Sequence, residues 1–384
     1  MTDRAPITGT DALTGRGIAV TVEGETITAV EPHGDPEPGL LSAGLIDLQV
    51  NGFAGLDLND GALTPATVRD LCARLVRLGV TGFLPTVITA DQPTICNALA
   101  AIRAARDTDP VAAAMIAGVH VEGPSISPLD GPRGAHPAAH VRRPSLDEFA
   151  AWQKAAAGLV RLVTLAPEQP GALEYIAALR QRDVHCAIGH SGATPEQIDA
   201  AVRAGARLST HLGNGAAAEL PRHPNLIWSQ LAADALMASF IADGHHLPPA
   251  PFKAMVRAKG LDRSILVSDS VAMAGMPPGR YEQAIGGTVD VAENGRISMA
   301  GTPYLAGAGI PLAACVPLAM DMAGLPLADV LPLATTNPGR FVGRDEGLSP
   351  GARADIIRFE MPPAGGARQL DIGEVWLAGR AVRP

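Results

Sequence analysis

The sequence predicts an α/β fold: a (β/α)8 TIM-type barrel with a small β-sandwich domain built from both chain ends. Two observations support this prediction. In the middle of the chain, short apolar runs alternate with segments of helical periodicity, and eight such runs can be counted. At both ends, apolar and polar residues instead alternate with a period of two, which is typical of half-buried strands.

The candidate barrel strands are rich in Val, Ile, Leu and Ala. They span residues 44–49, 81–88, 116–122, 160–166, 184–190, 208–212, 238–243 and 265–269. Helix-start signals lie between them: Thr64 and Thr194 each precede a proline, and Ser145 with Glu148 has the spacing of a capping box. We therefore expect a helix to follow most strands, as a barrel requires.

The two chain ends do not continue the barrel pattern. Residues 17–30 alternate around a Glu-Gly-Glu turn, which predicts a hairpin, and residues 354–359 and 374–382 have the same style. Because isolated hairpins are marginally stable, these ends most simply pair into one small domain. The expected boundaries are 1–43 and 343–384 for the small β domain and 44–342 for the barrel. After the eighth strand, we expect a β insertion at 280–306 and helices near 309–323 and 326–336.

Composition excludes several classes of partner. The net charge of −9 and the pI near 5.6 argue against nucleic acid. No run of about 18 apolar residues occurs and the N-terminal residues form no apolar leader, so we expect no membrane association. The four cysteines are far apart and form no Cys-x-x-Cys pair, which fits a reducing compartment. The sequence predicts a cytoplasmic protein.

Four strand ends carry chemically active side chains: Glu122, His190, His211 and Asp269. In a barrel of parallel strands, these ends meet at one rim. A carboxylate and two imidazoles with an open position are typical of catalytic zinc, and a further carboxylate suits a general base that takes a proton from water and passes it to a leaving nitrogen. Taken singly, each residue could instead be a salt-bridge partner, a hydrogen-bonder or a turn cap. Together they predict a metal-dependent hydrolase.

Several motifs, in order along nearly the whole chain, resemble those of the N-acetylglucosamine-6-phosphate deacetylases, a family of the amidohydrolase superfamily. They are GLIDLQVNG (44–52), HVEGP (120–124), GAHP (134–137), GHS (189–191), THLGN (210–214), ADGHH (242–246), SDS (268–270) and the closing LSPGARAD (348–355). Each motif alone is weak, but as a set they are specific. The resemblance implies hydrolysis of the N-acetyl group of an N-acetylhexosamine 6-phosphate, most simply N-acetylglucosamine 6-phosphate, to an amino sugar phosphate and acetate.

The resemblance also implies a metal held by Glu122, His190 and His211, with Asp269 as the acid and base. Many amidohydrolases hold a second metal with a His-x-His on the first strand. Here those positions are Gln49 and Asn51, which share a face but are poor ligands. We therefore expect one divalent ion per chain, with zinc favoured, and count Gln49 and Asn51 among the substrate-side residues.

Further substrate contacts follow from the same resemblance. His136 corresponds to a histidine near the scissile amide, Asn214 and the backbone of Gly215 to a segment that touches the phosphosugar, and Arg222 and His246 to phosphate and sugar contacts. The guanidinium of Arg222 is suited to a phosphate by its bidentate fork. A homodimer is expected, and the sequence leaves open whether a neighbouring subunit supplies Arg222.

Two other functions remain open at this stage. One is an amidohydrolase of the same mechanism acting on a different N-acyl or cyclic amide without phosphate; Arg222 and His246 argue against it, because a neutral substrate does not need them. The other is a sensor that binds without turnover, which has no need of Asp269. The loop at 301–307 departs from the family pattern and brings Tyr304 near the pocket. The preferred sugar stereochemistry also stays open.

Overall fold

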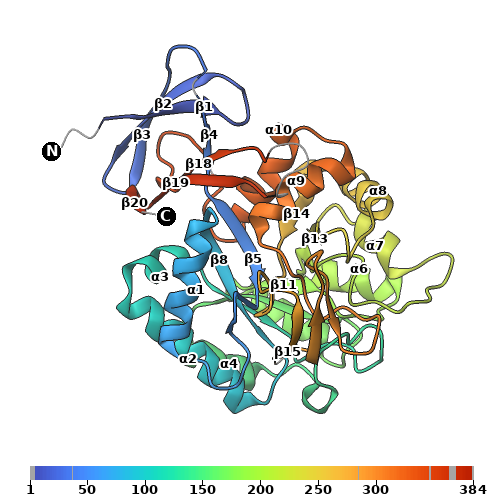
Figure 1. Ribbon diagram of the computed structural model, residues 1–384. Helices are drawn as coiled ribbons and strands as arrows, with labels where there is room; N and C mark the ends of the chain where they lie inside the picture. The colour runs from blue at the N-terminus through green and yellow to red at the C-terminus, as the bar shows by residue number, and fades with distance from the viewer. Residues whose placement is uncertain (1–4, 37, 284, 346, 363–368, 383–384) are drawn as a thin grey trace.

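The computed structural model describes residues 5–36, 38–283, 285–345, 347–362 and 369–382. Eight parallel strands form one sheet in the order β14-β13-β12-β11-β10-β9-β8-β5. The strands are β5 (Leu45–Val50), β8 (Val80–Ile88), β9 (Val119–Glu122), β10 (Val160–Leu165), β11 (His185–Ile188), β12 (Leu208–Ser209), β13 (Met237–Ile241) and β14 (Ser264–Val267). The first and last strands meet, because Val50 pairs with Ser270 and the Asp269 N–H donates to the Gln49 carbonyl at 3.0 Å. The predicted barrel is confirmed (Figure 1).

Helices surround the barrel on its outer face (Figure 1). They are α1 (Pro65–Arg77), α2 (Gln92–Thr108), α3 (Pro110–Met115), α4 (Leu146–Ala155), α5 (Ala172–Arg180), α6 (Pro195–Ala204), α7 (Leu226–Ala232) and α8 (Pro249–Lys259). The side chains of Thr64 and Thr194 cap α1 and α6 as expected. At α4 the expected capping box is only half formed: the Ser145 hydroxyl accepts the Glu148 N–H, but the Glu148 carboxylate accepts from Arg142 Nε at 2.9 and 3.0 Å. The stronger charge-assisted partner takes that carboxylate.

The two chain ends form the expected small β domain. Its strands are β1 (Ile7–Asp11), β2 (Gly17–Glu23), β3 (Thr26–Pro32), β4 (Leu40–Ala43), β18 (Ile356–Glu360), β19 (Asp371–Leu377) and β20 (Arg380–Val382). They are hydrogen-bonded in the order β20-β19-β18-β4-β1-β2-β3, and the antiparallel pairing of β4 with β18 joins the N-terminal and C-terminal parts. Val20, Ile27, Leu41 and Ile356 pack in one buried cluster of this domain.

The β insertion and the later helices also occur where expected. The insertion is a three-stranded antiparallel sheet of β15 (Gly279–Gln283), β16 (Gly287–Val291) and β17 (Ile297–Met299), and α9 (Leu312–Ala323), α10 (Leu327–Val330) and α11 (Thr336–Gly339) follow it. The short strands β6 (Gly52–Phe53) and β7 (Leu56–Asp57) and the 3-10 turns η1 (Ala138–His140), η2 (Leu261–Arg263) and η3 (Leu331–Ala334) complete the assignment. Within the described ranges, no single helix has the length and apolarity to cross a membrane. The segments Leu312–Ala323 and Leu327–Gly339 are long and apolar enough only when they are taken together, and the chain bends by 117° between them.

The barrel interior is filled at one end and polar at the other. Leu84, Leu162, Ile241 and Ile265 form one buried apolar cluster. Asp269, by contrast, lies two residues beyond the end of β14. In Figure 1 the small domain lies at the end of the barrel where the strands begin, and β15 lies at the end where they finish. The polar side chains therefore gather at the second end, the mouth of the barrel.

Candidate active site at the mouth of the barrel

The four strand-end residues predicted from the sequence all reach this mouth. Glu122 is the last residue of β9, and His190, His211 and Asp269 each lie two residues beyond the end of their strand. These last three have positive φ values of 50°, 31° and 50°. Residues other than glycine rarely adopt this left-handed conformation, and such strain clusters at functional sites. Here it turns each side chain sharply from the strand end toward the mouth.

Glu122 lies at the centre of a buried cluster. Its Oε1 is 3.1 Å from His211 Nε2 and 3.3 Å from His190 Nε2, and its Oε2 is 3.9 Å from His136 Nε2. The Gln49 side chain donates from Nε2 to Oε1 at 2.9 Å. The sequence motifs assigned His136 to the substrate; in the structure its ring also approaches the cluster, with a ligand atom within 4.8 Å of those of Glu122 and His190.

The donor set of this cluster fits a divalent cation. The ring of His190 donates from Nδ1 to the Pro132 carbonyl at 3.0 Å, and its Nε2 faces Glu122 Oε1. Metal-binding histidines are generally oriented in this way by a hydrogen bond from the other ring nitrogen. One carboxylate and imidazole nitrogens that converge at one point are the ligands that zinc takes in catalytic sites.

Burial and neighbouring charges shift the pKa values of the cluster. Burial favours the protonated form of Glu122, but hydrogen bonds from His190 and His211 and the charges of these two rings outweigh it, so the pKa of Glu122 lies well below its usual value. For His211 burial lowers the pKa, but the hydrogen bond to Glu122 and the negative charges of Glu122 and Asp269 together raise it above its usual value. Burial lowers the pKa of His136 to about 3, which makes its imidazole neutral.

Asp269 lies in the same mouth and has a different environment. Asn51 donates from Nδ2 to Asp269 Oδ1 at 2.8 Å. Burial raises the pKa of Asp269 to about 6, and the positive charge of His211 opposes part of this rise. A carboxyl group with this pKa can both accept and return a proton near neutral pH. Gln49 and Asn51, expected on the substrate side, are thus bonded to the two carboxylates, and only Asn51 also lines the cavity.

A cavity of about 280 Å³ opens above these groups. Its walls include His136, Asn214, Gly215 and His246, as the sequence motifs indicated, together with Tyr304 from loop 301–307, whose side chain is 70% exposed at the rim. The lining brings together the Glu122, His190 and His211 cluster, the carboxyl group of Asp269 and several hydrogen-bonding groups in one concave space. This combination is typical of a hydrolytic active site.

Gly215 has a steric role that the sequence did not indicate. Its φ is +55°, and a Cβ at this position would lie 2.8 Å from His190 Nδ1. Its carbonyl accepts the Ser191 N–H at 3.1 Å, next to His190 in the chain. Glycine is therefore required here for the loop after β12 to pack against His190.

Two histidines and one arginine lie outside the catalytic cluster or the cavity. The ring of His120 donates from Nδ1 to the Leu48 carbonyl at 3.2 Å and accepts from the Thr164 hydroxyl at Nε2 at 2.7 Å, a structural role. His245 Nε2 is 3.2 Å from the Asn294 carbonyl. Arg222 is exposed in the loop between β12 and α7 and is not among the described residues that line the cavity. Its contact with a phosphate stays a prediction.

The sequence reasoning missed the residues that orient two of the cavity histidines. Thr89 Oγ1 is 2.9 Å from His136 Nδ1, and Asp243 Oδ2 is 2.7 Å from His246 Nδ1. Asp243 also accepts the N–H groups of His245 and His246 at 2.8 Å, so it holds the whole turn. The position of Asp243, three residues before His246 and just after β13, could have indicated that it orients that ring. No pattern in the sequence indicates that Thr89, which follows β8, orients His136.

Comparisons with known proteins agree with this geometry. Residues 40–382 match the model of the amidohydrolase family. The chain is 31% identical over 373 residues to an N-acetylgalactosamine-6-phosphate deacetylase of Escherichia coli O157:H7, covering 95% of this chain and 92% of that protein. It is 34% identical over 274 residues to an N-acetylglucosamine-6-phosphate deacetylase of Bacillus subtilis, covering 71% and 67%.

A solved structure is similar over nearly its whole length. It is an aspartate-to-alanine mutant of the N-acetyl-D-glucosamine-6-phosphate deacetylase of Mycobacterium smegmatis, in complex with N-acetyl-D-glucosamine-6-phosphate. The match has a TM-score of 0.86 at 29% identity and covers 98% of this chain and 97% of that one. Given the matched family model, the relatives and the clustered strand-end residues, this chain belongs to the amidohydrolase family, among the N-acetylhexosamine-6-phosphate deacetylases.

Proposed function

We propose that this protein hydrolyses the N-acetyl group of an N-acetylhexosamine 6-phosphate, with N-acetylglucosamine 6-phosphate as the favoured substrate, to an amino sugar 6-phosphate and acetate. The observation that carries the proposal is one cavity that joins the Glu122, His190 and His211 cluster to Asp269. The names of the relatives and the sugar phosphate bound in the Mycobacterium smegmatis structure support the choice of substrate.

Glu122, His190 and His211 are the proposed ligands of one divalent ion, and their mixed nitrogen and oxygen donors favour zinc. When bound, such an ion polarises an amide carbonyl and lowers the pKa of water at the site. Gln49 supports the set by donating to Glu122. Neither Gln49 nor Asn51 is a strong ligand, and Asn51 is already bonded to Asp269, so a single ion is proposed.

Asp269 is the proposed acid and base. Its carboxylate accepts a proton from the attacking water while the water oxygen forms a bond to the carbonyl carbon. Asp269 then gives that proton to the amide nitrogen as the C–N bond breaks, which releases acetate and the free amine. Asn51 holds Oδ1 of this carboxyl and fixes its direction during both transfers. The pKa of about 6 suits both directions of transfer.

The sugar and its phosphate are proposed to lie against the loops after β12 and β13. Asn214, the backbone of Gly215 and His246 line that side of the cavity. Asp243 fixes the ring of His246 through Nδ1, so Nε2 is free to face a ligand. His136, held neutral and bonded to Thr89, is proposed to contact the scissile amide. Arg222 remains the proposed partner of the phosphate. We propose further that the protein is a homodimer and that it acts in the cytoplasm.

Amine release tests the proposal directly. The purified protein, loaded with zinc, is assayed with the N-acetyl forms of glucosamine and galactosamine, each with and without the 6-phosphate. We expect kcat/KM to be highest for a phosphorylated sugar, because a charge-assisted contact to phosphate is worth roughly 1.5–3 kcal/mol, or about one to two decades. Equal rates with and without phosphate would instead favour an amidohydrolase of the same mechanism that acts on an unphosphorylated amide.

A further inference from the structure

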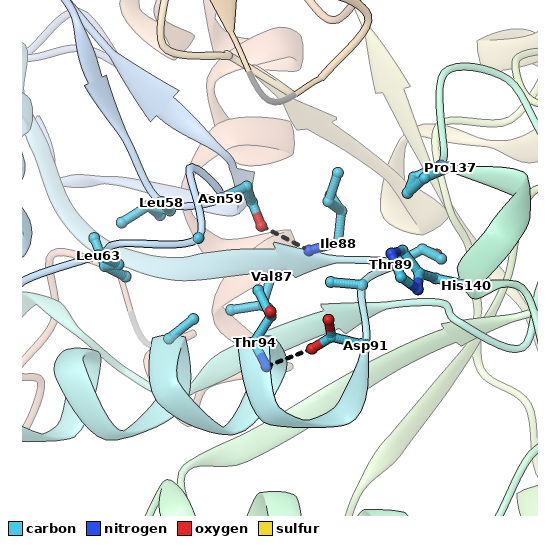
Figure 2. Close-up of a pocket in the computed structure, with 13 residues that line it drawn as sticks. Leu58, Asn59, Leu63, Val87, Ile88, Thr89, Asp91, Thr94, Pro137 and His140 are labelled. Atoms are coloured by element: carbon cyan, nitrogen blue, oxygen red, sulfur yellow. Dashed lines mark hydrogen bonds between the residues drawn. The ribbon is translucent and has the colours of Figure 1, made fainter.

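A second cavity lies directly beside the catalytic one. Its volume is about 210 Å³, and it opens between the loop after β7, the end of β8 and the beginning of α2 (Figure 2). Its lining is largely apolar, with Leu58, Leu63, Val87 and Ala98 among the contributors. The polar groups on its edge are mostly engaged: Asp91 accepts the Thr94 N–H at 2.8 Å as the cap of α2. The mechanism described above makes no use of this space.

Ile88 lies on the border of both cavities. Among the residues that the structure describes, Ile88 alone borders both of them. On the catalytic side it packs in an apolar cluster with Val271 and Ile285, next to Ala135. Its backbone is held from the other side, because its N–H donates to Asn59 Oδ1 at 2.9 Å (Figure 2). Ile88 is 7% exposed and is the residue that the two cavities share.

The position of Ile88 in the barrel places it near the acyl end of the substrate. In the ring of eight strands, β8 lies four strands from β12, so Ile88 faces the β12 loop across the mouth. Under the proposed function the sugar lies at the β12 and β13 loops, the carbonyl at the Glu122 cluster and the amide nitrogen at Asp269. The carbonyl carbon and the nitrogen of an amide carry their substituents in opposite directions, because the bond is planar and trans. The acyl methyl group then points toward β8 and Ile88.

We propose that Ile88 determines the length of the acyl group, and that its side chain closes off an apolar cavity able to take a longer chain. This inference rests on the proposed function. With Ile88 in place, the space beyond the carbonyl carbon fits a methyl group and excludes longer acyl chains. With a smaller residue, the two cavities join, and the same reaction occurs on longer amides. The water oxygen bonds to the carbonyl carbon as Asp269 takes a proton from the water, and Asp269 returns that proton to the nitrogen as the C–N bond breaks, which releases the longer carboxylate and the amino sugar 6-phosphate.

The test measures acyl selectivity in Ile88→Ala. The substrates are N-acetyl-, N-propanoyl- and N-butanoyl-glucosamine 6-phosphate, and kcat/KM is taken from amine release with the zinc-loaded enzyme. For the wild type we expect a fall of about tenfold or more for each added methylene, the usual discrimination of a closed apolar pocket. For Ile88→Ala we expect the ratio of butanoyl to acetyl kcat/KM to rise by at least about tenfold, because the wall is gone. An unchanged ratio would overturn the proposal.

Two control variants separate the wall from the cavities themselves. Val87→Ala enlarges only the second cavity, and Val271→Ala enlarges only the catalytic one. Both should leave the butanoyl-to-acetyl ratio near its wild-type value, and a rise in either as large as in Ile88→Ala would refute the assignment of Ile88. Should Ile88→Ala fail to fold, Ile88→Val decides: a raised propanoyl-to-acetyl ratio supports the wall, and no rise overturns it. A wild type without activity on the acetyl substrate would instead reject the proposed function.

Discussion

Replacing Asp269 by Asn should abolish most catalysis while it leaves the fold and the metal site intact. The amide cannot accept the proton of the attacking water, and general acid–base groups contribute roughly 100- to 10,000-fold to rates. This range corresponds to about 2.7–5.5 kcal/mol in the activation free energy. The assay is kcat for amine release from N-acetylglucosamine 6-phosphate, measured alongside metal content and the thermal unfolding midpoint.

The structure indicates why this change is local. The backbone at Asp269 is held independently of the side chain: its N–H donates to the Gln49 carbonyl at 3.0 Å and its carbonyl accepts the Ala308 N–H at 3.1 Å. In the variant, the side-chain carbonyl oxygen can still accept from Asn51, as Oδ1 does now. Volume and packing are preserved, so only the capacity to take a proton is lost.

Asn51→Ala is the matched control. It keeps the carboxylate and removes one hydrogen bond to it, which costs roughly 1.5–3 kcal/mol for a charged acceptor and less where water can replace the donor. We expect a smaller loss of kcat than in Asp269→Asn. The reasoning fails if Asp269→Asn retains kcat within about tenfold of the wild type, below the lower bound for acid–base catalysis, or if its loss of activity is matched by loss of metal.

Four further outcomes are expected. Since burial raises the pKa of Asp269 to about 6 and a bound cation lowers it, kcat/KM should fall as the pH drops through 6 or below, and an acidic limb above pH 7 would contradict its role as base. Elemental analysis should find about one divalent ion per chain, lost in His211→Ala; two ions at full occupancy would rule out the single-metal site. Arg222→Ala should lower kcat/KM by about one to two decades on the phosphorylated sugar and little on the unphosphorylated one, whereas equal losses would assign it a structural role. Asp355→Ala should lower the free energy of unfolding, measured in urea, by roughly 3 kcal/mol. The reason is that the nearly buried Arg344, whose Nη1 lies 3.6 Å from Asp355 Oδ2, loses its carboxylate partner. A change below about 1 kcal/mol would mean that solvent already screens the pair.

The sequence contained most of the information on the fold because barrel strands and helices are encoded locally. Apolar runs near the right length, prolines after N-capping threonines and the alternation at both ends each report on a few neighbouring residues. The half-formed capping box at α4 marks the limit of this reasoning. Glu148 has the right spacing from Ser145, but Arg142 takes its carboxylate, and the competition depends on how the preceding loop folds.

The sequence by itself determined which residue types stand at the strand ends, and parallel topology then requires that Glu122, His190, His211 and Asp269 share one rim. Only the tertiary structure decided which atoms meet. Asn51 and Asp269 are 218 residues apart, and no local pattern specifies that one amide supports that carboxylate. The same holds for Ile88, which reads as an ordinary strand residue and becomes a wall between two cavities only when α2 and the loop after β7 pack beside it. Local patterns fix secondary structure, but the geometry of a site depends on contacts between distant segments, and these form only when the barrel closes.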